Sequence, residues 1–457
     1  MTRFPLSAAA LPWLAAAFAL ASAGCASASR EEQAARDQVR AAGARLHPAG
    51  GRADLPVLKA DAPLADYLRF ALLNHPAVEA AYADWRAAVL AIGPARALPD
   101  PRFTFEADVT NVLEQFMPGL MFDFMTPGKR AAMAREATAA SGVARRNFVS
   151  AVLAAAAETQ KAWIELAYVD EAIRLRKASV STLDEAAGLA AASYTTSSGM
   201  ASLDSQLRLI NDLAQTRSQL DALGDRRAAV RARFKSSLGL LPGDADPPWP
   251  QAALQASALP DEDELWRRVQ ASNPGLGEMR AMVDMALAGV EAARRTGTPD
   301  FQLGGMVDLK MNPLLYRPLA NVTLPIWREK IAATVAAARA RQEAASARVN
   351  AGLLEMAAQL AQMLSMVRES DRMIGTIDGT VLPNLERIVA STEAGYQTGI
   401  SGAAMIPETR LMALNLRLER AAALRDRETA ATGLLLMTAD IAPATAPLIT
   451  GVRAPAP

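Results

Sequence analysis

The sequence predicts a mainly α-helical chain made of two copies of one unit, each containing a β-hairpin and a very long helical hairpin. Three observations predict this fold class. Long alanine-rich stretches lack proline, pairs of alternating strands separate these stretches, and similar residues recur about two hundred positions apart. Alanine is the strongest helix former, whereas proline breaks a helix interior. We therefore expect duplicated long coiled-coil helical hairpins with two β-hairpins per chain.

The composition favours long packed helices over a compact aromatic core. Of the 457 residues, 51% are hydrophobic but only 5% are aromatic. The 48 basic residues balance the 48 acidic ones, so the net charge gives no reason to expect a nucleic-acid partner.

Residues 1–24 have the features of an export signal. Arg3 precedes an apolar run from Ala8 to Leu20, and the small residues Ser22-Ala23-Gly24 follow it. A basic start, an apolar centre and a small-residue cleavage site define a signal peptide. The apolar run is too short for a mature transmembrane helix.

Cys25 is the single cysteine of the chain. Ala21-Ser22-Ala23-Gly24-Cys25 resembles a bacterial lipobox, although Ser22 replaces the usual leucine. The resemblance implies that Cys25 is acylated and that residues 25–60 form a lipidated linker. Ala26 is not the aspartate associated with inner-membrane retention, which favours the outer membrane. The alternative is an ordinary secretory signal with an incidental cysteine. One acyl chain alone binds a membrane only marginally, so a second attachment is expected.

Two halves of the chain carry similar residues in the same order. The matching sets are Asn74-His75-Pro76 with Asn273-Pro274, Pro99-Asp100-Pro101 with Pro299-Asp300, Gly128-Lys129-Arg130 with Glu329-Lys330, and Tyr194 and Gly199 with Tyr396 and Gly399. Such self-similarity indicates an internal repeat. We expect repeat 1 at 61–250, with a β-hairpin at 101–126 and a helical hairpin at 131–240. Repeat 2 is expected at 259–440, with a β-hairpin at 300–325 and a helical hairpin at 330–438, followed by a flexible tail at 441–457. A helix containing a proline begins each repeat.

The helices between the hairpins are predicted to be rods. Residues 131–193 as one helix would extend about 90 Å at 1.5 Å per residue. In repeat 2, apolar residues recur at coiled-coil spacings: Leu360, Leu364, Val367, Ile374, Val381, Leu385 and Ile388. Pro383 falls within this run, where it should kink the helix or mark a local break.

Four segments alternate apolar and polar residues as β-strands do. The run from Phe103 to Thr110 alternates without error. From Phe301 to Asn312, Phe301, Leu303, Gly305, Val307, Leu309 and Met311 alternate with Gln302, Gly304, Met306, Asp308, Lys310 and Asn312. Leu120 to Phe124 and Tyr316 to Leu324 supply their mates, with Pro118-Gly119 expected in the loop or at the strand start. A soluble sheet covering a helix layer would alternate in the same way, so the pattern fits both a buried face and a lipid face.

Charge placement and length favour strands that span a membrane. Four strands cannot close a barrel, and open edges in lipid leave unsatisfied backbone groups. Each chain would then supply a share of an oligomeric transmembrane β-barrel, with two copies giving eight strands and three giving twelve. By strand parity the lumen-facing candidates are Glu106, Asp108, Asp123, Asp308, Lys310 and Arg317. Simple solvation of exposed strand faces is the alternative for each of them.

The order of these features, twice over and behind a lipobox, resembles the TolC-type outer membrane efflux protein family, in its lipoprotein branch. Leu324 to Ile331 and Tyr396 to Ser401 are the closest local matches. The resemblance implies a homotrimer in outer-membrane lipid with a large periplasmic part, a shared twelve-stranded barrel and a helical tunnel. It also implies a periplasmic adaptor and an inner-membrane pump as partners, and a passive exit route from the periplasm.

The resemblance places the adaptor-contacting tips at the two turns between long helices. The tip candidates are Tyr194, Thr195, Gly199, Asp204, Tyr396, Thr398, Gly399 and Ser401. Relatives often have an aspartate soon after the tip glycine. Here Asp204 is the nearest acid after Gly199, and Gly399 is followed by Ile400 and Ser401.

No catalytic or cofactor chemistry is expected. His47 and His75 are far apart and lack a carboxylate at ligand spacing, so no zinc site or histidine-based triad is supported. Gap filling by the methionines near the hairpins is favoured over soft-metal binding. The rival function is a lipid-anchored periplasmic coiled-coil scaffold that transports nothing.

Overall fold

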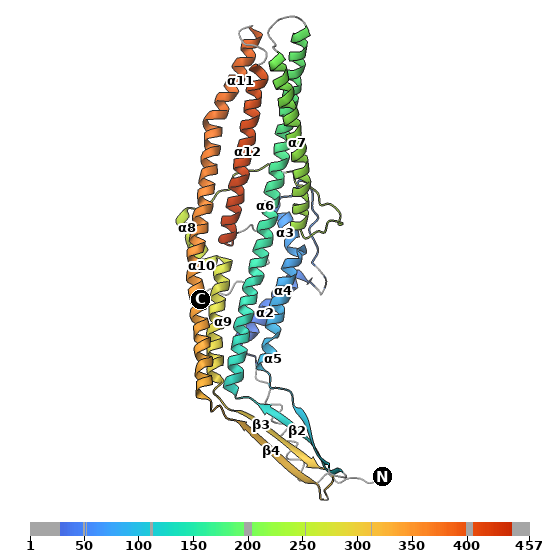
Figure 1. Cartoon of the computed structure of the whole chain (residues 1–457), viewed down its shortest axis with the longest axis vertical. Helices are drawn as coiled ribbons and strands as arrows, with labels where there is room; N and C mark the ends of the chain where they lie inside the picture. Colours follow the sequence, from blue (N-terminus) through green and yellow to red (C-terminus); the bar gives the residue numbers. More distant parts are fainter. Residues whose placement is uncertain are drawn as a thin grey trace.

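The computed structural model describes residues 28–48, 51, 53–109, 113–195, 203–251, 253–311, 313–398 and 405–440. It is an elongated molecule with a four-stranded sheet at one end and two helical hairpins at the other (Figure 1). The described elements are α2 (Arg30–Leu46), α3 (Leu64–Asn74), α4 (Pro76–Leu90), α5 (Ile92–Arg96), β1 (Arg102–Val109), β2 (Leu113–Phe124), α6 (Pro127–Thr195), α7 (Leu203–Ser237), α8 (Glu262–Ser272), α9 (Pro274–Arg295), β3 (Asp300–Asp308), β4 (Leu315–Thr323), α10 (Arg328–Thr376), the π-helix η2 (Ile377–Val381), α11 (Leu382–Gln397) and α12 (Met405–Met437).

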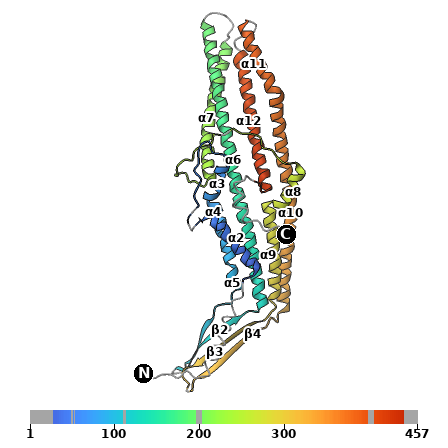
Figure 2. The same cartoon turned by 180° about the vertical axis from the view of Figure 1, so that it is seen from behind.

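The same order of elements occurs twice. Short helices lead into a β-hairpin, which leads into a long helix and its returning partner, first from α3 to α7 and then from α8 to α12. The view from behind shows the two long hairpins, α6 with α7 and α11 with α12, side by side along the shaft (Figure 2). The N-terminal segment expected as a linker contains α2, whose Ala42 and Leu46 are buried with Tyr82 and Trp85 of α4.

Pro76 and Pro274 each begin a helix and do not lie inside one, which corrects the sequence-based expectation. Pro76 is the first residue of α4, and Pro274 is the first residue of α9. The first helical position needs no N–H donor, so proline is tolerated there. The His75 Nδ1 atom accepts a hydrogen bond from the Ala77 N–H and caps α4. Burial lowers the pKa of His75, which keeps the imidazole neutral and able to accept.

An asparagine ties the start of each repeat to its end. The Asn74 Nδ2 atom donates to the Leu238 carbonyl at 2.9 Å, and the Asn273 Nδ2 atom donates to the Met437 carbonyl at 3.1 Å. Both bonds span 164 residues, and both are buried. They occupy carbonyls at the C-terminal ends of α7 and α12, which have no partner within the helix. Asn273 also caps α9 by accepting from the Leu276 N–H.

The long helices pack through small and aliphatic side chains. The α6 helix has 69 residues, about 100 Å at 1.5 Å per residue. Along it, Val152 and Ala156 join a core with α3 and α4, and Leu166 and Val169 join a second core with Phe234 of α7. A third core holds Leu360, Leu364 and Val367 of α10 against α8, α9 and α12. Leu166 and Val169 therefore serve packing.

A break occurs where Pro383 predicts one, and it changes the helix face that follows. The π-helix η2 lies just before Pro383, which sits in the first turn of α11. A π turn inserts one residue into the helical repeat. As a result Ile377 is buried, whereas Val381 and Ile388 are exposed. The predicted coiled-coil stripe is thus correct from Leu360 to Val367 and wrong at Val381 and Ile388.

The four strands form one antiparallel sheet in the order β1-β2-β3-β4. Phe103 lies opposite Leu120, Phe124 opposite Phe301, and Leu303 opposite Ala320. Pro118 and Gly119 lie inside β2, not in a loop or at the strand start as expected. Pro118 lies in a gap of the β2–β3 ladder, between the paired residues that start at Gly119 and the hydrogen bond from the Leu309 N–H to the Phe116 carbonyl. A proline cannot donate to a ladder, so it is tolerated in such a gap.

The asparagine ties give a test of the duplicated fold. Replacing Asn74 with Ala leaves the buried Leu238 carbonyl without its donor, which should lower the free energy of unfolding by about 1–3 kcal/mol. Asn273→Ala should cost more, because Asn273 also caps α9. Urea unfolding of the purified protein, followed by circular dichroism, measures both.

Asn415→Ala is the matched control, since Asn415 bonds to Arg176 on the exposed surface. It should change the unfolding free energy by no more than about 0.5 kcal/mol. Equal effects at all three asparagines would contradict a special role for the two ties.

Candidate functional site

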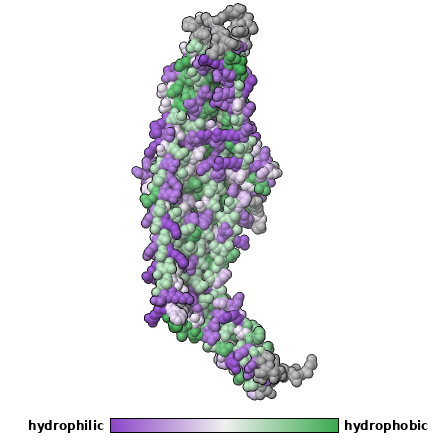
Figure 3. All heavy atoms as spheres, in the orientation of Figure 1, coloured by the Kyte–Doolittle hydropathy of each residue, from purple (hydrophilic) through white to green (hydrophobic). Residues whose placement is uncertain are grey.

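One face of the sheet is apolar throughout. The register places these residues on it: Phe103, Phe105, Ala107, Phe116, Pro118, Leu120, Phe122, Phe124, Phe301, Leu303, Gly305, Val307, Tyr316, Pro318, Ala320 and Val322. Phe103 and Phe105 are each 67% exposed. Figure 3 shows dark green residues over the sheet and at the lower end of the shaft. A contiguous apolar face of this kind marks contact with a membrane or a partner.

The opposite face carries most of the polar residues singled out in the sequence. Glu106 and Asp108 of β1, Asp123 of β2, Asp308 of β3 and Arg317 of β4 all share it by register. Lys310 lies just beyond the end of β3, and its backbone N–H donates to Asp308 Oδ1 at 2.9 Å. The structure therefore brings these residues to one face of the sheet, but Asp308 is buried there and not exposed as a lumen-facing residue would be. Leu315 and Leu319 of β4 share that face as well.

Ion pairs join charged residues across this polar face. Arg102 of β1 lies 3.0 Å from Asp123 of the neighbouring strand β2. Arg317 of β4 lies 3.8 Å from Glu106 of β1, although two strands separate them. Such a reach requires the sheet to curve with its polar face on the concave side. This curvature is the one a barrel with a polar interior needs.

Methionines fill the concave face, a feature that alternation alone did not indicate. Met117, Met121 and Met306 are buried there among the charged residues. A Cβ atom at Gly119 would lie 2.5 Å from both the Gly305 carbonyl oxygen and the Met306 side chain. A Cβ atom at Gly304 would lie 2.4 Å from the Leu120 carbonyl oxygen. The two glycines therefore make room for close strand approach beneath the methionines.

The sheet joins the shaft through a partly buried junction. Lys129 Nζ at the start of α6 lies 2.5 Å from Asp300 Oδ2 at the start of β3. The hydroxyl groups of Thr126 and Thr298 are 3.2 Å apart beside this pair. These contacts connect repeat 1 with repeat 2 where the strands of both repeats meet the helices of the shaft. Sequence analysis noted Lys129 and Asp300 only as repeat markers and missed their contact.

The described tip residues lie where the long helices end. Tyr194 and Thr195 are the last residues of α6, and Asp204 lies in the first turn of α7. Tyr396 is exposed near the end of α11, and Thr398 Oγ1 donates to the Ala394 and Gly395 carbonyls. Both hairpins end at the same end of the shaft, opposite the sheet (Figures 1 and 2).

Four predicted residues lie outside the described residues: Cys25, Gly199, Gly399 and Ser401. The same holds for the signal peptide at 1–24 and the tail at 441–457.

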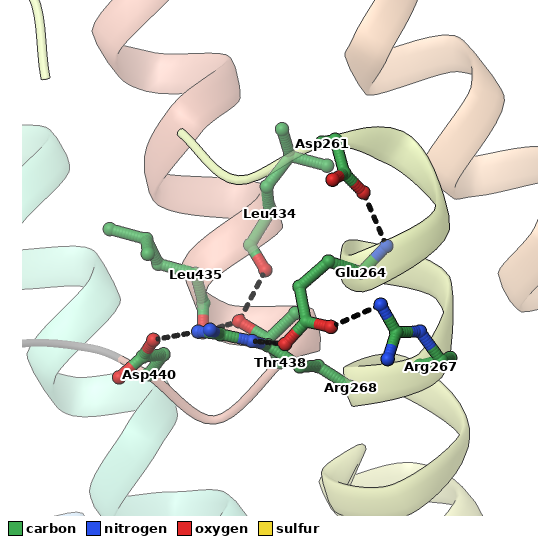
Figure 4. A network of polar contacts seen from close by, with 8 residues as sticks. All are labelled: Asp261, Glu264, Arg267, Arg268, Leu434, Leu435, Thr438 and Asp440. Carbon is green, nitrogen blue, oxygen red and sulfur yellow. Dashed lines mark hydrogen bonds and ion pairs between the residues drawn. The ribbon is translucent and has the colours of Figure 1, made fainter. Parts of the chain in front are cut away.

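A polar network joins α8 to the end of α12 in repeat 2 (Figure 4). Arg268 of α8 donates to Glu264 at 2.7 Å and to Asp440, just after α12, at 2.9 Å. The Arg268 hydrogen bond, together with the charge of Arg267, lowers the pKa of Glu264. The network holds the end of α12 against the first helix of its own repeat.

Among the helices of the described residues, none combines the length and apolar character required to cross a membrane.

The comparisons with known proteins agree with this geometry. Residues 265–439 match the family model described as outer membrane efflux protein. The match covers less than half of the chain, and it shows what this part of the chain is similar to. The matched residues begin within α8 and run to just beyond α12, so the family match covers nearly all of repeat 2.

Solved channel structures have the same fold over most of the chain. The CusC structure, whose title concerns conformational changes accompanying folding and transmembrane channel formation, has 14% identity and a TM-score of 0.70, covering 86% of this chain and 96% of that one. The CmeC outer membrane channel of Campylobacter jejuni has 15% identity and a TM-score of 0.66, with 82% and 85% covered. The MtrE outer membrane channel of Neisseria gonorrhoeae has 16% identity and a TM-score of 0.69, with 83% and 89% covered.

A comparison with curated protein sequences gives no match. At these identities the structural matches establish the fold of both repeats. The similarity to the outer membrane efflux protein model lies in repeat 2.

The glycines beneath the methionines provide a test of the sheet. Gly119→Ala and Gly304→Ala should each disrupt the β2–β3 ladder, because the new methyl group would overlap a backbone oxygen. We expect little folded protein for either variant, measured by protection of the hairpins from added protease.

Gly305→Ala is the matched control on the other face. A Cβ atom there meets only the Arg317 carbonyl oxygen, at the ordinary contact distance of 3.7 Å. Wild-type protection is expected for this variant. Equal tolerance of all three substitutions would contradict the β2–β3 register.

Proposed function

We propose that this chain is a subunit of an outer-membrane channel that serves a tripartite efflux system as the passive exit duct from the periplasm. The apolar convex face of the sheet carries the proposal. In water, sixteen adjoining positions without one charged side chain would expose a large hydrophobic surface. In lipid the same surface is stable, while polar groups on the concave face line a water-filled lumen.

The open edges of the sheet support an oligomer. The strands β1 and β4 are the edge strands, and each has one row of backbone groups that the other described strands do not pair. In the hydrocarbon region each unsatisfied group costs several kcal/mol, so the sheet must close with other copies. Eight strands from two copies would enclose an interior that side chains fill. Twelve strands from three copies leave room for a duct, so we propose a homotrimer.

Charges on the concave face would set the selectivity of the barrel. In the closed barrel, Glu106, Asp108, Asp123 and Arg317 would line the lumen, with Lys310 at the outer end of β3, whereas Asp308 is buried in the sheet. Three of these five lining side chains are acidic, which favours the passage of cations and neutral solutes over anions. The proposed role is conduction without catalysis, with the driving force supplied by a pump in the inner membrane.

The shaft would carry the duct across the periplasm. The ends of α6, α7, α11 and α12 lie at the end of the shaft opposite the sheet, where a periplasmic adaptor would bind. Tyr194, Thr195, Asp204, Tyr396 and Thr398 lie at or near these helix ends. Trp327, 71% exposed between β4 and α10, fits the aromatic belt at the inner boundary of the membrane. An acyl chain on Cys25 would add a second attachment to the same membrane.

Membrane attachment distinguishes this function from a lipid-anchored scaffold. A Cys25→Ala variant lacks any acyl chain but keeps the sheet, so it should stay in the outer-membrane pellet after a carbonate wash. The spanning strands, and not the lipid, hold the channel in the bilayer.

The wild-type chain and an outer-membrane lipoprotein without spanning strands, both treated in parallel, are the controls. Complete release of the Cys25→Ala chain into the wash would exclude spanning strands and favour the scaffold.

A further inference from the structure

The two repeats place equivalent strands at the middle and at the edges of the sheet. Residue pairs 200 positions apart match along both hairpins: Asp100 with Asp300, Asp108 with Asp308, and Pro118 with Pro318. The hairpin registers agree with this offset, because Phe103 lies opposite Leu120 and Leu303 lies opposite Ala320. Thus β3 is the counterpart of β1, and β4 is the counterpart of β2.

This equivalence makes the internal β2–β3 ladder a template for the contact between copies. We infer that β4 of one copy pairs with β1 of the next copy in the β2–β3 register. Lys330 of the first copy then forms an ion pair with Asp100 of the partner subunit. The inference rests on the proposed oligomeric channel and goes beyond it by fixing the register and the contacts of the seam. The occupant of each open edge is a second copy of this chain.

The transferred register keeps the two faces of the sheet intact. In the template, Phe122 lies opposite Leu303 and Met121 opposite Gly304. The counterparts at the seam are Val322 opposite Phe103 of the partner subunit and Asn321 opposite Thr104 of the partner subunit. The first pair lies on the apolar face and the second on the polar face. A slip by one residue would place Val322 on the polar face.

Charge also matches at the seam. The template hydrogen bond from the Leu309 N–H to the Phe116 carbonyl, at 3.1 Å, extends the register toward the strand ends. The same register sets Arg317 opposite Asp108 of the partner subunit, and opposite charges at facing positions stabilise a strand pair. Within one copy Arg317 lies only 3.8 Å from Glu106, so its side chain already extends along the concave face toward a β1 strand.

The junction with the shaft repeats in the same way. Lys129 is the third residue of α6, and Lys330 is the third residue of α10. Asp300 is the counterpart of Asp100, and within the chain Lys129 binds Asp300 at 2.5 Å. Among the described residues, neither Lys330 nor Asp100 forms an ion pair, and both are exposed. Lys129 and Asp300 thus form an ion pair within one chain, whereas Lys330 and Asp100 would form the equivalent ion pair between neighbouring copies.

The helices beside the sheet offer a surface for the same neighbour. Within the chain α6 packs along α9, with Gly289 of α9 against Glu136 of α6. The counterparts of α9 and α6 are α4 and α10, and these lie in different copies at the seam. Each exposes a large apolar residue, Leu90 at 61% on α4 and Leu354 at 75% on α10. Packing of α10 against α4 of the next copy would bury this surface.

Cysteine pairs at the seam test the register directly. Thr104→Cys with Asn321→Cys, introduced into the full chain, should form disulfide-linked dimers and trimers when outer membranes are oxidised. Facing residues of an antiparallel pair lie within disulfide distance. Non-reducing electrophoresis measures the linked species, and each single variant controls for Cys25.

Two further cysteine pairs make every outcome decisive. Asp123→Cys with Gln302→Cys is an internal facing pair, so it should link within one copy and migrate as a monomer. Thr104→Cys with Thr323→Cys slips the seam by two residues on the same face and should link poorly. If the slipped pair links and the predicted pair does not, the register is wrong although the channel stands. If neither links while the internal pair does and the protein remains oligomeric, the seam is wrong. A purely monomeric protein would reject the proposed function as well.

A charge swap tests the ion pair. Lys330→Asp alone sets two acidic residues against each other, and it should raise the dissociated fraction in detergent by roughly two- to fivefold. Asp100→Lys combined with Lys330→Asp should restore the wild-type fraction, as measured by size-exclusion chromatography. A double variant as unstable as the single one would show that Lys330 and Asp100 do not meet.

Discussion

A short sheet with one apolar face and two open edges is the constraint on which the rest of this structure depends. Lipid accepts the apolar face but leaves edge backbone groups without partners. Water accepts the edges but not the face. The two demands are met together only when the sheet closes with copies of itself. The shaft, the junction and the curvature of the sheet can each be understood as supporting that closure.

The duplication of the chain lets one kind of contact between repeats close the whole sheet. Because repeat 1 and repeat 2 fold alike, the contact between them inside one chain also describes the contact between chains. The Asn74 and Asn273 ties, equal in span, hold each repeat in the same shape. The Lys129–Asp300 pair then sets the direction in which both repeats leave the shaft. A ring built this way has nearly equivalent joints throughout.

Much of this architecture follows from local sequence patterns. Alternation correctly assigned Glu106, Asp108 and Arg317 to one face, since strand parity is a property of neighbouring residues. The absence of proline from 128 to 241 predicted the length of α6 and α7. The predictions that were wrong concern residues where a local sequence rule is overridden by contacts with distant parts of the chain. Pro118 stands inside β2 because it lies in a gap of the β2–β3 ladder, and the π turn before Pro383 rotated Val381 and Ile388 out of the packed stripe.

Contacts between distant residues were the part that one sequence could not supply. Lys129 and Asp300 are 171 residues apart, and nothing near either predicts the other. The burial of Met117 and Met306 on a polar face likewise depends on the curvature of the sheet and on two glycines in neighbouring strands. The repeat did hold a signal for the junction, because lysine and aspartate recur at corresponding positions in both halves.

The subunit count of the intact protein tests the central claim most directly. Native mass spectrometry of the protein, extracted from outer membranes in mild detergent, reports the number of chains per particle without any substitution. Three chains per particle are predicted, because twelve strands close a barrel with an open lumen. A particle of one chain would contradict the account, since a single four-stranded sheet has no way to satisfy its edges in lipid.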